Sequence, residues 1–149
     1  MLIFKGGILI KSKLLILSFF LSLIVSKVSL STEVIVHSSV VETHLSTIQL
    51  RRIYTMRQVR WLDNSPIVVF VLSRKNSLHQ NFSKEVLRIF PYQLDRIWHK
   101  LTFSGLGVAP IKVDSQEELI QLVKQTPGAI GYADNVYNEE GLHVIEIKE

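Results

Sequence analysis

The chain has no cysteine, and among its 149 residues only 2 are methionines, 2 are tryptophans and 4 are prolines. The absence of cysteine excludes a thiol nucleophile, and it also excludes the disulfides on which many small exported domains depend. A domain built from this sequence therefore has to be stable through the packing of its core alone. That is usual for a chain of this length and unusual only for much smaller ones.

Acidic residues are missing from positions 1–31, whereas that segment contains four lysines, Lys5, Lys11, Lys13 and Lys27. Between the last two of them lies LLILSFFLSLIV. Its length falls within the about 7–15 residues of a signal-peptide core and is short of the about 20 needed to span a bilayer. Small residues at Ser29 and Ser31 suit a signal peptidase. We therefore predict an export signal at 1–31, cleaved after Ser31, followed by one domain at 32–149; an uncleaved N-terminal anchor is the alternative.

The remaining chain has no net charge. Of the 17 basic residues four fall within 1–31, and none of the 13 acidic residues does, so 13 of each sign remain. This removes the main reason to expect nucleic acid as a partner, since a nucleic-acid-binding domain is usually basic. The charge is still uneven: 43–113 has 11 cations and 3 acids, whereas 114–149 has 2 and 8. Two faces of one domain could pair in this way, or a cationic surface could remain free to bind an anion.

Strand and helix patterns alternate along the domain, which predicts an α/β class with a largely parallel sheet flanked by helices. The expected strands are 33–37, 67–72, 129–132 and 143–147, the last of them at an edge of the sheet because its residues alternate. The expected helices are 46–54, 76–90, one that opens at Pro91, and 115–125. Two of the helix starts have the spacing of a capping box, Ser46 with Gln49 and Ser115 with Glu118.

The stretch LSRKNSLHQNF, residues 72–82, is the first candidate site. An apolar strand ends there in two cations, Arg74 and Lys75, and Asn76 and Ser77 follow where a helix begins. A helix N-terminus offers unpaired N–H groups and a partial positive charge, and an arginine can pair with two oxygens of an oxyanion. The alternative is that Ser77 merely caps the helix while the cations point into water.

Ser38 and Ser39 are the second half of this candidate site. They follow the first expected strand, and the carboxyl ends of parallel strands meet at one edge of a sheet, where ligands of α/β proteins bind. We therefore expect both serines to lie at the same edge as Arg74, Asn76 and Ser77. An ordinary serine-rich turn is an equally good interpretation of the pair.

Other residues favour no further chemistry. The loop around Gly105 and Gly107 has neither the spacing nor the lysine of a nucleotide-binding loop. The five histidines lack metal-ligand spacing, and no Ser-His-Asp arrangement or paired-carboxylate motif is visible. Trp61 and Trp98 are expected to be anchors in the core or at its edge. We expect no enzyme activity, no metal and no cofactor.

A series of motifs occurs in an order that resembles one known family. They are Leu45-Ser-x-x-Gln-Leu-Arg-Arg-Ile-Tyr54, Trp61, the strand with Arg74, the helix with Phe82, Trp98, Phe103-Ser-Gly105 and Pro127-Gly-Ala-Ile-Gly-Tyr132. Together they resemble the phosphate-binding proteins of ABC transporters and the short exported proteins related to them. The resemblance runs from about residue 33 to 147 and implies a type II periplasmic-binding-protein fold. Full members have two lobes, so this chain looks like a single lobe, the second.

The resemblance implies a periplasmic protein with phosphate or another small oxyanion as its ligand. The family motif Arg-x-x-Gly-Ser-Gly-Thr is replaced by Arg74-Lys-Asn-Ser77-Leu-His79, which keeps the arginine and a serine but neither the glycines nor the threonine. With one lobe and a reduced motif, we expect weak binding. The alternative function is a protein–protein interaction module that keeps the fold and docks on a periplasmic or membrane protein.

Overall fold

The structure is a computed structural model that describes residues 31–149. The predicted export signal, apart from Ser31, lies outside the described residues. Among the helices that the structure describes, none has the length and apolar character needed to cross a membrane.

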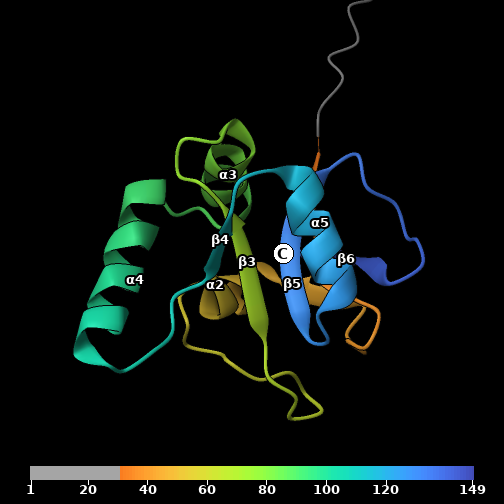
Figure 1. Ribbon diagram of the computed structural model, residues 1–149, viewed down its shortest axis with the longest axis horizontal. Helices are drawn as coiled ribbons and strands as arrows, with labels where there is room; N and C mark the ends of the chain where they lie inside the picture. Colours follow the sequence, from red (N-terminus) through yellow and green to blue (C-terminus); the bar gives the residue numbers. More distant parts are fainter. Residues whose placement is uncertain (1–30) are drawn as a thin grey trace, which may run out of the picture.

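The domain is built on a six-stranded sheet with the order β2-β6-β1-β5-β3-β4 (Figure 1). The strands are β1 (Thr32–His37), β2 (His44–Ser46), β3 (Val68–Leu72), β4 (Ile111–Val113), β5 (Ala129–Asp134) and β6 (Leu142–Lys148). The apolar runs of β3 and β5 are buried almost throughout, as expected for central strands covered on both faces. The predicted α/β class, a sheet flanked by helices, is confirmed.

The sheet is mixed, because β1 runs against the other five strands. It pairs antiparallel with β5 on one side and with β6 on the other, whereas β3 is parallel to both β4 and β5. Strand direction cannot be read from an apolar run alone, so the expectation of a largely parallel sheet holds for every strand except this one. Because of this reversal, the residues that follow β1 lie at the amino end of the parallel strands and not at their carboxyl end.

The last strand, β6, is not at an edge, and that prediction is wrong. It lies between β1 and the short strand β2, whose residues His44 to Ser46 pair with Glu146 to Lys148. The three residues of β2 had been assigned to a loop and a helix start. A strand so short has no periodicity to detect, and the edges of the sheet are β2 and β4.

Helices cover the sheet on both faces. The helix α5 (Gln116–Gln125) packs across β1, β3 and β5 on one face, where a Cβ at Gly131 would lie 2.5 Å from Leu119. Successive strand residues point to opposite faces. Tyr132 therefore points to the other face, toward α2 (Thr47–Tyr54) and the helical segment that contains Phe82. Figure 1 shows α5 in front of the sheet and α2 behind it.

The second face has an aromatic core. Phe82 stacks on Tyr132 with ring centroids 4.0 Å apart and meets Tyr54 edge-on at 4.9 Å. Trp98 of α4 (Pro91–Ser104) donates its indole N–H to the carbonyl oxygen of Tyr54 at 2.8 Å. Trp61 and Trp98 are both buried, so their predicted role as anchors of the core is confirmed.

The helix predicted over 76–90 is shorter and less regular than expected. It consists of α3 (Ser77–Asn81) and a π-helical turn, η1 (Phe82–Val86), closed by a bond from the Leu87 N–H to the Phe82 carbonyl. Arg88 has a positive φ of 54°, and the buried Ser83 hydroxyl donates to the Ile89 carbonyl. These contacts stop the helix before Pro91 opens α4, although the apolar spacing alone would have let it continue to Phe90.

Candidate functional site

The carboxyl ends of β3 and β4 hold a cleft of about 730 Å³. Arg74 and Lys75 reach it from the segment after β3, Lys112 from β4, and Arg96 from α4. Two acids, Asp95 and Asp114, also line it, so its charged side chains carry two more positive than negative charges. Tyr92 and His99 add an aromatic and an imidazole ring from the same side of α4.

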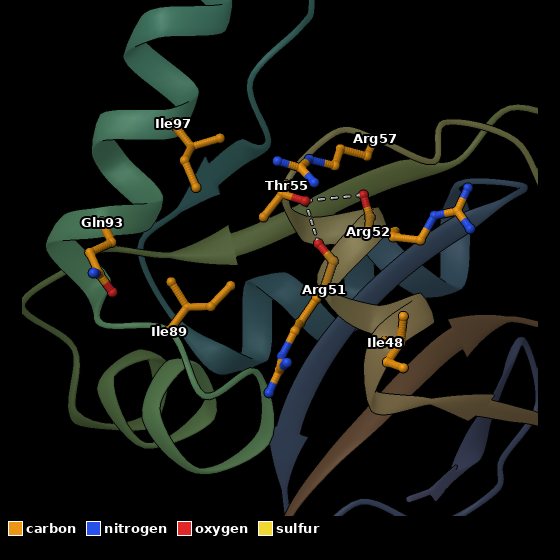
Figure 2. Close-up of a pocket in the computed structure, with 8 residues that line it drawn as sticks. All are labelled: Ile48, Arg51, Arg52, Thr55, Arg57, Ile89, Gln93 and Ile97. Atoms are coloured by element: carbon orange, nitrogen blue, oxygen red, sulfur yellow. Dashed lines mark hydrogen bonds between the residues drawn. The ribbon is translucent and has the colours of Figure 1, made fainter.

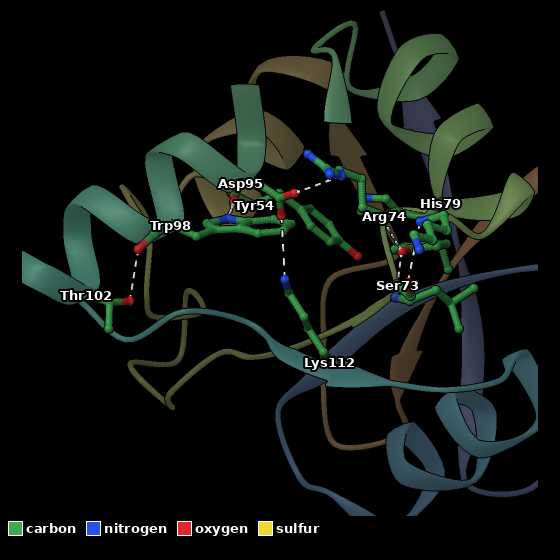
Figure 3. Close-up of polar contacts among 11 residues, drawn as sticks. Tyr54, Ser73, Arg74, His79, Asp95, Trp98, Thr102 and Lys112 are labelled. Atoms are coloured by element: carbon green, nitrogen blue, oxygen red, sulfur yellow. Dashed lines mark hydrogen bonds and ion pairs between the residues drawn. The ribbon is translucent and has the colours of Figure 1, made fainter. Parts of the chain in front are cut away.

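Asp95 organises the cations of this cleft. Its Oδ2 lies 3.5 Å from Nε of Arg74 and its Oδ1 lies 3.6 Å from Nζ of Lys112, so one carboxylate bridges two strands (Figure 3). The side chain of Asp95 is only 14% exposed, whereas those of Arg74 and Lys112 are more than half exposed. Each cation therefore keeps N–H groups that face solvent and that can bind an anion beside the carboxylate.

Asn76 forms the start of α3. Its Oδ1 accepts from the backbone N–H of Leu78 at 2.9 Å, so Asn76 is the N-cap residue and Ser77 is the first helical residue. The capping oxygen is therefore occupied, and Asn76 could offer an anion only its Nδ2 group. The turn before it is closed by the Asn76 N–H bonding to the Ser73 carbonyl at 2.9 Å. Arg74, Asn76 and Ser77 all follow the end of β3, but of the three only Arg74 lines the cleft.

Ser38 and Ser39 do not join them. Val36, near the end of β1, pairs with Ile130 near the start of β5, so both serines lie at the amino end of the parallel strands. There the Ser39 hydroxyl accepts from the backbone N–H of Gly128 at 3.1 Å. The two serines were expected at the same end of the strands as Arg74. That prediction is wrong, because it assumed that β1 is parallel to β3. In this position Ser39 holds the turn before β5, and the Ser38 N–H bonds to the Gly141 carbonyl.

A buried histidine, His79, does not line the cleft but lies near enough for the charges of Asp95 and Lys112 to act on it. His79 is 1% exposed, and its Nδ1 lies 2.5 Å from the Tyr132 hydroxyl, which also accepts from the Leu72 N–H at 2.9 Å. The Tyr132 hydroxyl therefore joins a backbone N–H of β3 to the imidazole of His79. The ring of His79 lies near those of Tyr132 and Trp98, with centroids 5.9 and 6.2 Å away.

We expect acidification to destabilise the protein through His79. The pKa of His79 is lowered, mainly because the ring is buried. The charge of Asp95 raises this pKa, and the charge of Lys112 lowers it. The unfolded chain therefore binds a proton near the ordinary pKa of about 6.5, which the native state does not bind. The contribution of His79 to the free energy of unfolding should be fully present above that pKa and should be lost as the pH falls below it.

This pH dependence can be measured by urea unfolding between about pH 7.5 and pH 5. The variant His79→Gln should be less stable at neutral pH, since it lacks the bond to Tyr132, but its stability should fall less steeply with acid. The matched control is His99→Gln, at an exposed histidine on α4. Equal slopes for wild type and His79→Gln would show that this histidine is not the titrating group.

Sequence reasoning missed two residues of the cleft, Asp95 and Lys112. Lys112 belongs to β4, a three-residue strand with no detectable pattern. Asp95 did leave a signal, since it is one of only three acids among the 14 charged residues of 43–113. An isolated acid in a cationic segment, next to the buried Leu94 on a helix, is a candidate for pairing with those cations.

Neither protein-family models nor curated protein sequences match this chain. Solved structures do match. A Clostridium perfringens protein, named as a phosphate ABC transporter substrate-binding protein and solved with bound phosphate, is 20% identical with a TM-score of 0.61; the match covers 78% of this chain and 44% of that one. PstS from Borrelia burgdorferi is 18% identical with a TM-score of 0.60, over 80% and 47% of the two chains.

A third match is an ABC-type phosphate transport receptor from Vibrio cholerae, 17% identical with a TM-score of 0.57, over 78% and 45% of the two chains. At such identities the likeness establishes the fold and not the ligand. This chain spans less than half the length of each of these three proteins. The predicted resemblance to phosphate substrate-binding proteins is confirmed at the level of a single-lobe fold.

Proposed function

We propose that the protein is exported and binds phosphate or a related small oxyanion weakly in the cleft at the carboxyl ends of β3 and β4. One observation carries this proposal: Arg74, just after β3, and Lys112, on the neighbouring strand β4, converge on Asp95 and keep more than half of each side chain exposed. A guanidinium can pair with two anion oxygens, whereas an ammonium acts as a point charge. Asn76 and Ser77 at the start of α3 would add hydrogen-bond donors.

Weak binding follows from the geometry. The cleft is open to water, which screens its charge-assisted contacts, and Asp95 competes with any anion for the same two cations. We expect a dissociation constant of tens of micromolar or weaker, where 1 µM corresponds to about 8 kcal/mol. The match to the proteins of similar fold covers less than half of the length of each of them.

The proposal is tested by calorimetric titration of phosphate and of sulfate at low and moderate salt. Arg74→Ala should weaken binding by about 1.5–3 kcal/mol, the range for a hydrogen bond to a charged group. Lys75→Ala should weaken it clearly less and mainly change its salt dependence. Arg60→Ala is the matched control, because Arg60 is exposed near the amino end of β3 and bonds to the Asn64 carbonyl.

Two results would contradict the proposal. If the wild type gives neither heat nor a thermal shift at millimolar anion, the cleft binds no oxyanion and Asn76 is simply a helix cap. If the anion binds but Arg74→Ala binds it equally well, the site lies elsewhere, and the loop at Ser104 and Gly105 is the next place to examine.

A second candidate function is a protein–protein interaction module. It is favoured by the last turn of α4 and the loop that follows it, where Phe103, Leu106 and Val108 are 90%, 82% and 83% exposed. The loop leads into β4, an edge strand whose outer side has no neighbour in the sheet. If this surface docks on a periplasmic or membrane protein, the pair Leu106→Ser and Val108→Ser should abolish a one-to-one complex that forms with or without phosphate.

A further inference from the structure

A second groove lies between α2 and the segment that leads into α4. It has a volume of about 440 Å³ and shares no lining residue with the cleft that contains Arg74. Three arginines and three isoleucines line it, together with Thr55 and Gln93 (Figure 2). This volume falls within the range of about 300–1,000 Å³ that is typical of ligand sites, and such sites combine apolar walls with a few polar groups.

The charge of this groove is of one sign. Arg51, Arg52 and Arg57 line it without any acidic residue, and none of the three forms an ion pair with an acid in residues 31–149. Arg51 is held in place, since its Nε donates to the Leu87 carbonyl at 2.7 Å, and this bond leaves its terminal nitrogens for another partner. The dipole of α2 stabilises the cations in its last turn, Arg51 and Arg52. It does not account for Arg57, which lies beyond the end of the helix.

The apolar part is also exposed. Ile48 is 67% exposed on α2, on the side of the groove opposite Ile89 and Ile97, which are only partly covered by the core. An aliphatic side chain that lies against these three residues would remove apolar surface from water, at about 25 cal/mol per Å². The groove can therefore bind apolar groups and anions together.

The arrangement of the charges selects the type of ligand. Figure 2 shows the guanidinium groups of Arg57 and Arg51 at opposite ends of the groove, with Ile89 along the wall between them and Arg52 turned away. A ligand with a single anionic head could use only one of these ends. A complementary ligand carries two separated negative charges with an aliphatic part between them, as a peptide with acids on either side of an aliphatic residue does.

We infer that this groove binds an acidic segment of a protein partner, with an aliphatic side chain against the isoleucines and carboxylates on Arg57 and Arg51. Ile48 lines the side of the groove opposite Ile89 and Ile97, so apolar walls face each other across it. The inference uses a different surface from the proposed oxyanion cleft and does not depend on it. The bond from Arg51 to Leu87 holds the groove in shape, so a change at Arg51 would also disturb the structure. Arg57 is the more direct test, because the structure records no bond from its side chain.

The test is fluorescence anisotropy with a short fluorescein-labelled peptide in which glutamates flank leucines. A second peptide has glutamine in place of each glutamate, and a third has serine in place of each leucine. We expect wild type to bind the first peptide best and to lose affinity as salt is raised. Arg57→Gln and Ile48→Asn should each weaken binding by about ten-fold, whereas phosphate titration should be unaffected by either.

Matched controls come from the same chain. Val41→Asn changes a side chain with the same 67% exposure as Ile48, on another part of the surface, and Arg60→Gln removes an exposed arginine outside the groove. Both should bind the peptide as the wild type does. Absence of binding, equal binding of the glutamine peptide, or binding that Arg57→Gln leaves unchanged would overturn the inference.

Two other occupants would be recognised by the same variants, and either would overturn the inference. If the protein ignores the peptide but binds phosphatidylglycerol vesicles in an Arg57-dependent manner, the surface is specific for an anionic membrane. If the wild type self-associates in sedimentation and Ile48→Asn abolishes that association, the occupant is the acidic surface of a second copy.

Discussion

Replacing Phe82 by alanine should lower the free energy of unfolding by about 3–5 kcal/mol, the usual effect of deleting a buried ring. Phe82 has no exposed surface, stacks on Tyr132 with centroids 4.0 Å apart, and contacts the edge of Tyr54. It also occupies the first position of the π-helical turn, where the backbone has little freedom to close the cavity. Because Tyr132 also bonds to His79, loss of the Phe82 ring should loosen the packing around that histidine as well.

Urea unfolding of the wild type and the variant, monitored by circular dichroism, measures this loss. Phe103→Ala is the matched control: it removes the same side chain from a position that is 90% exposed, and its stability should change by less than about 0.5 kcal/mol. A loss below about 1 kcal/mol in Phe82→Ala would mean that the aromatic core is not packed as described.

Replacing Gly128 by alanine should have a comparably large effect for a different reason. Gly128 has a φ of +75°, and a Cβ added to it would lie 2.3 Å from the carbonyl oxygen of Pro66. Its own carbonyl accepts from the Trp61 indole N–H at 2.9 Å and from the Val68 N–H at 3.1 Å. Because the clashing atom belongs to the backbone, the start of β3 has to move. We expect a loss of about 3 kcal/mol or more, beyond the about 1–2 kcal/mol of left-handed strain.

Gly105→Ala separates the two contributions to this effect. Gly105 has nearly the same φ, +69°, but a Cβ there would meet nothing within 4 Å, so only the backbone strain remains. The free energy of unfolding of Gly105→Ala should fall by about 1–2 kcal/mol. Thermal and urea unfolding of the two variants give the comparison, and equal losses would show that the contact with Pro66 is relieved without cost.

Helix starts were the most predictable features of this fold. Ser46 and Gln49 form both bonds of the predicted capping box, and Pro91 opens α4 as expected. Ser115 accepts from the Glu118 N–H, but the Glu118 carboxylate accepts from the Asp114 N–H, so only half of the second predicted box forms. Such signals depend on residues three or four positions apart, so they are complete within the local sequence. The helix predicted over 76–90 has regular apolar spacing as well, but the positive φ of Arg88 and the bond from Ser83 to Ile89 end it early.

The candidate site was predictable in part. Arg74, Asn76 and Ser77 are close together because they are neighbours in the chain, and the apolar run before them fixes where the strand ends. Asp95 was not predictable as their partner, because it reaches them from a helix whose direction depends on how Trp98 packs on Tyr54. Lys112 reaches the same carboxylate as Arg74 only because β4 pairs with β3.

By itself the sequence determined the α/β class, the burial of the apolar strands, the helix starts and the single-lobe resemblance, since these depend on periodicity, capping and motif order within short segments. Only the tertiary structure decided the direction of β1, and with it the separation of Ser39 from Arg74. That direction depends on pairing with β5 and β6, whose residues lie about 100 positions further along the chain. An apolar run is equally compatible with either direction, and only the hydrogen bonds to its neighbours distinguish them.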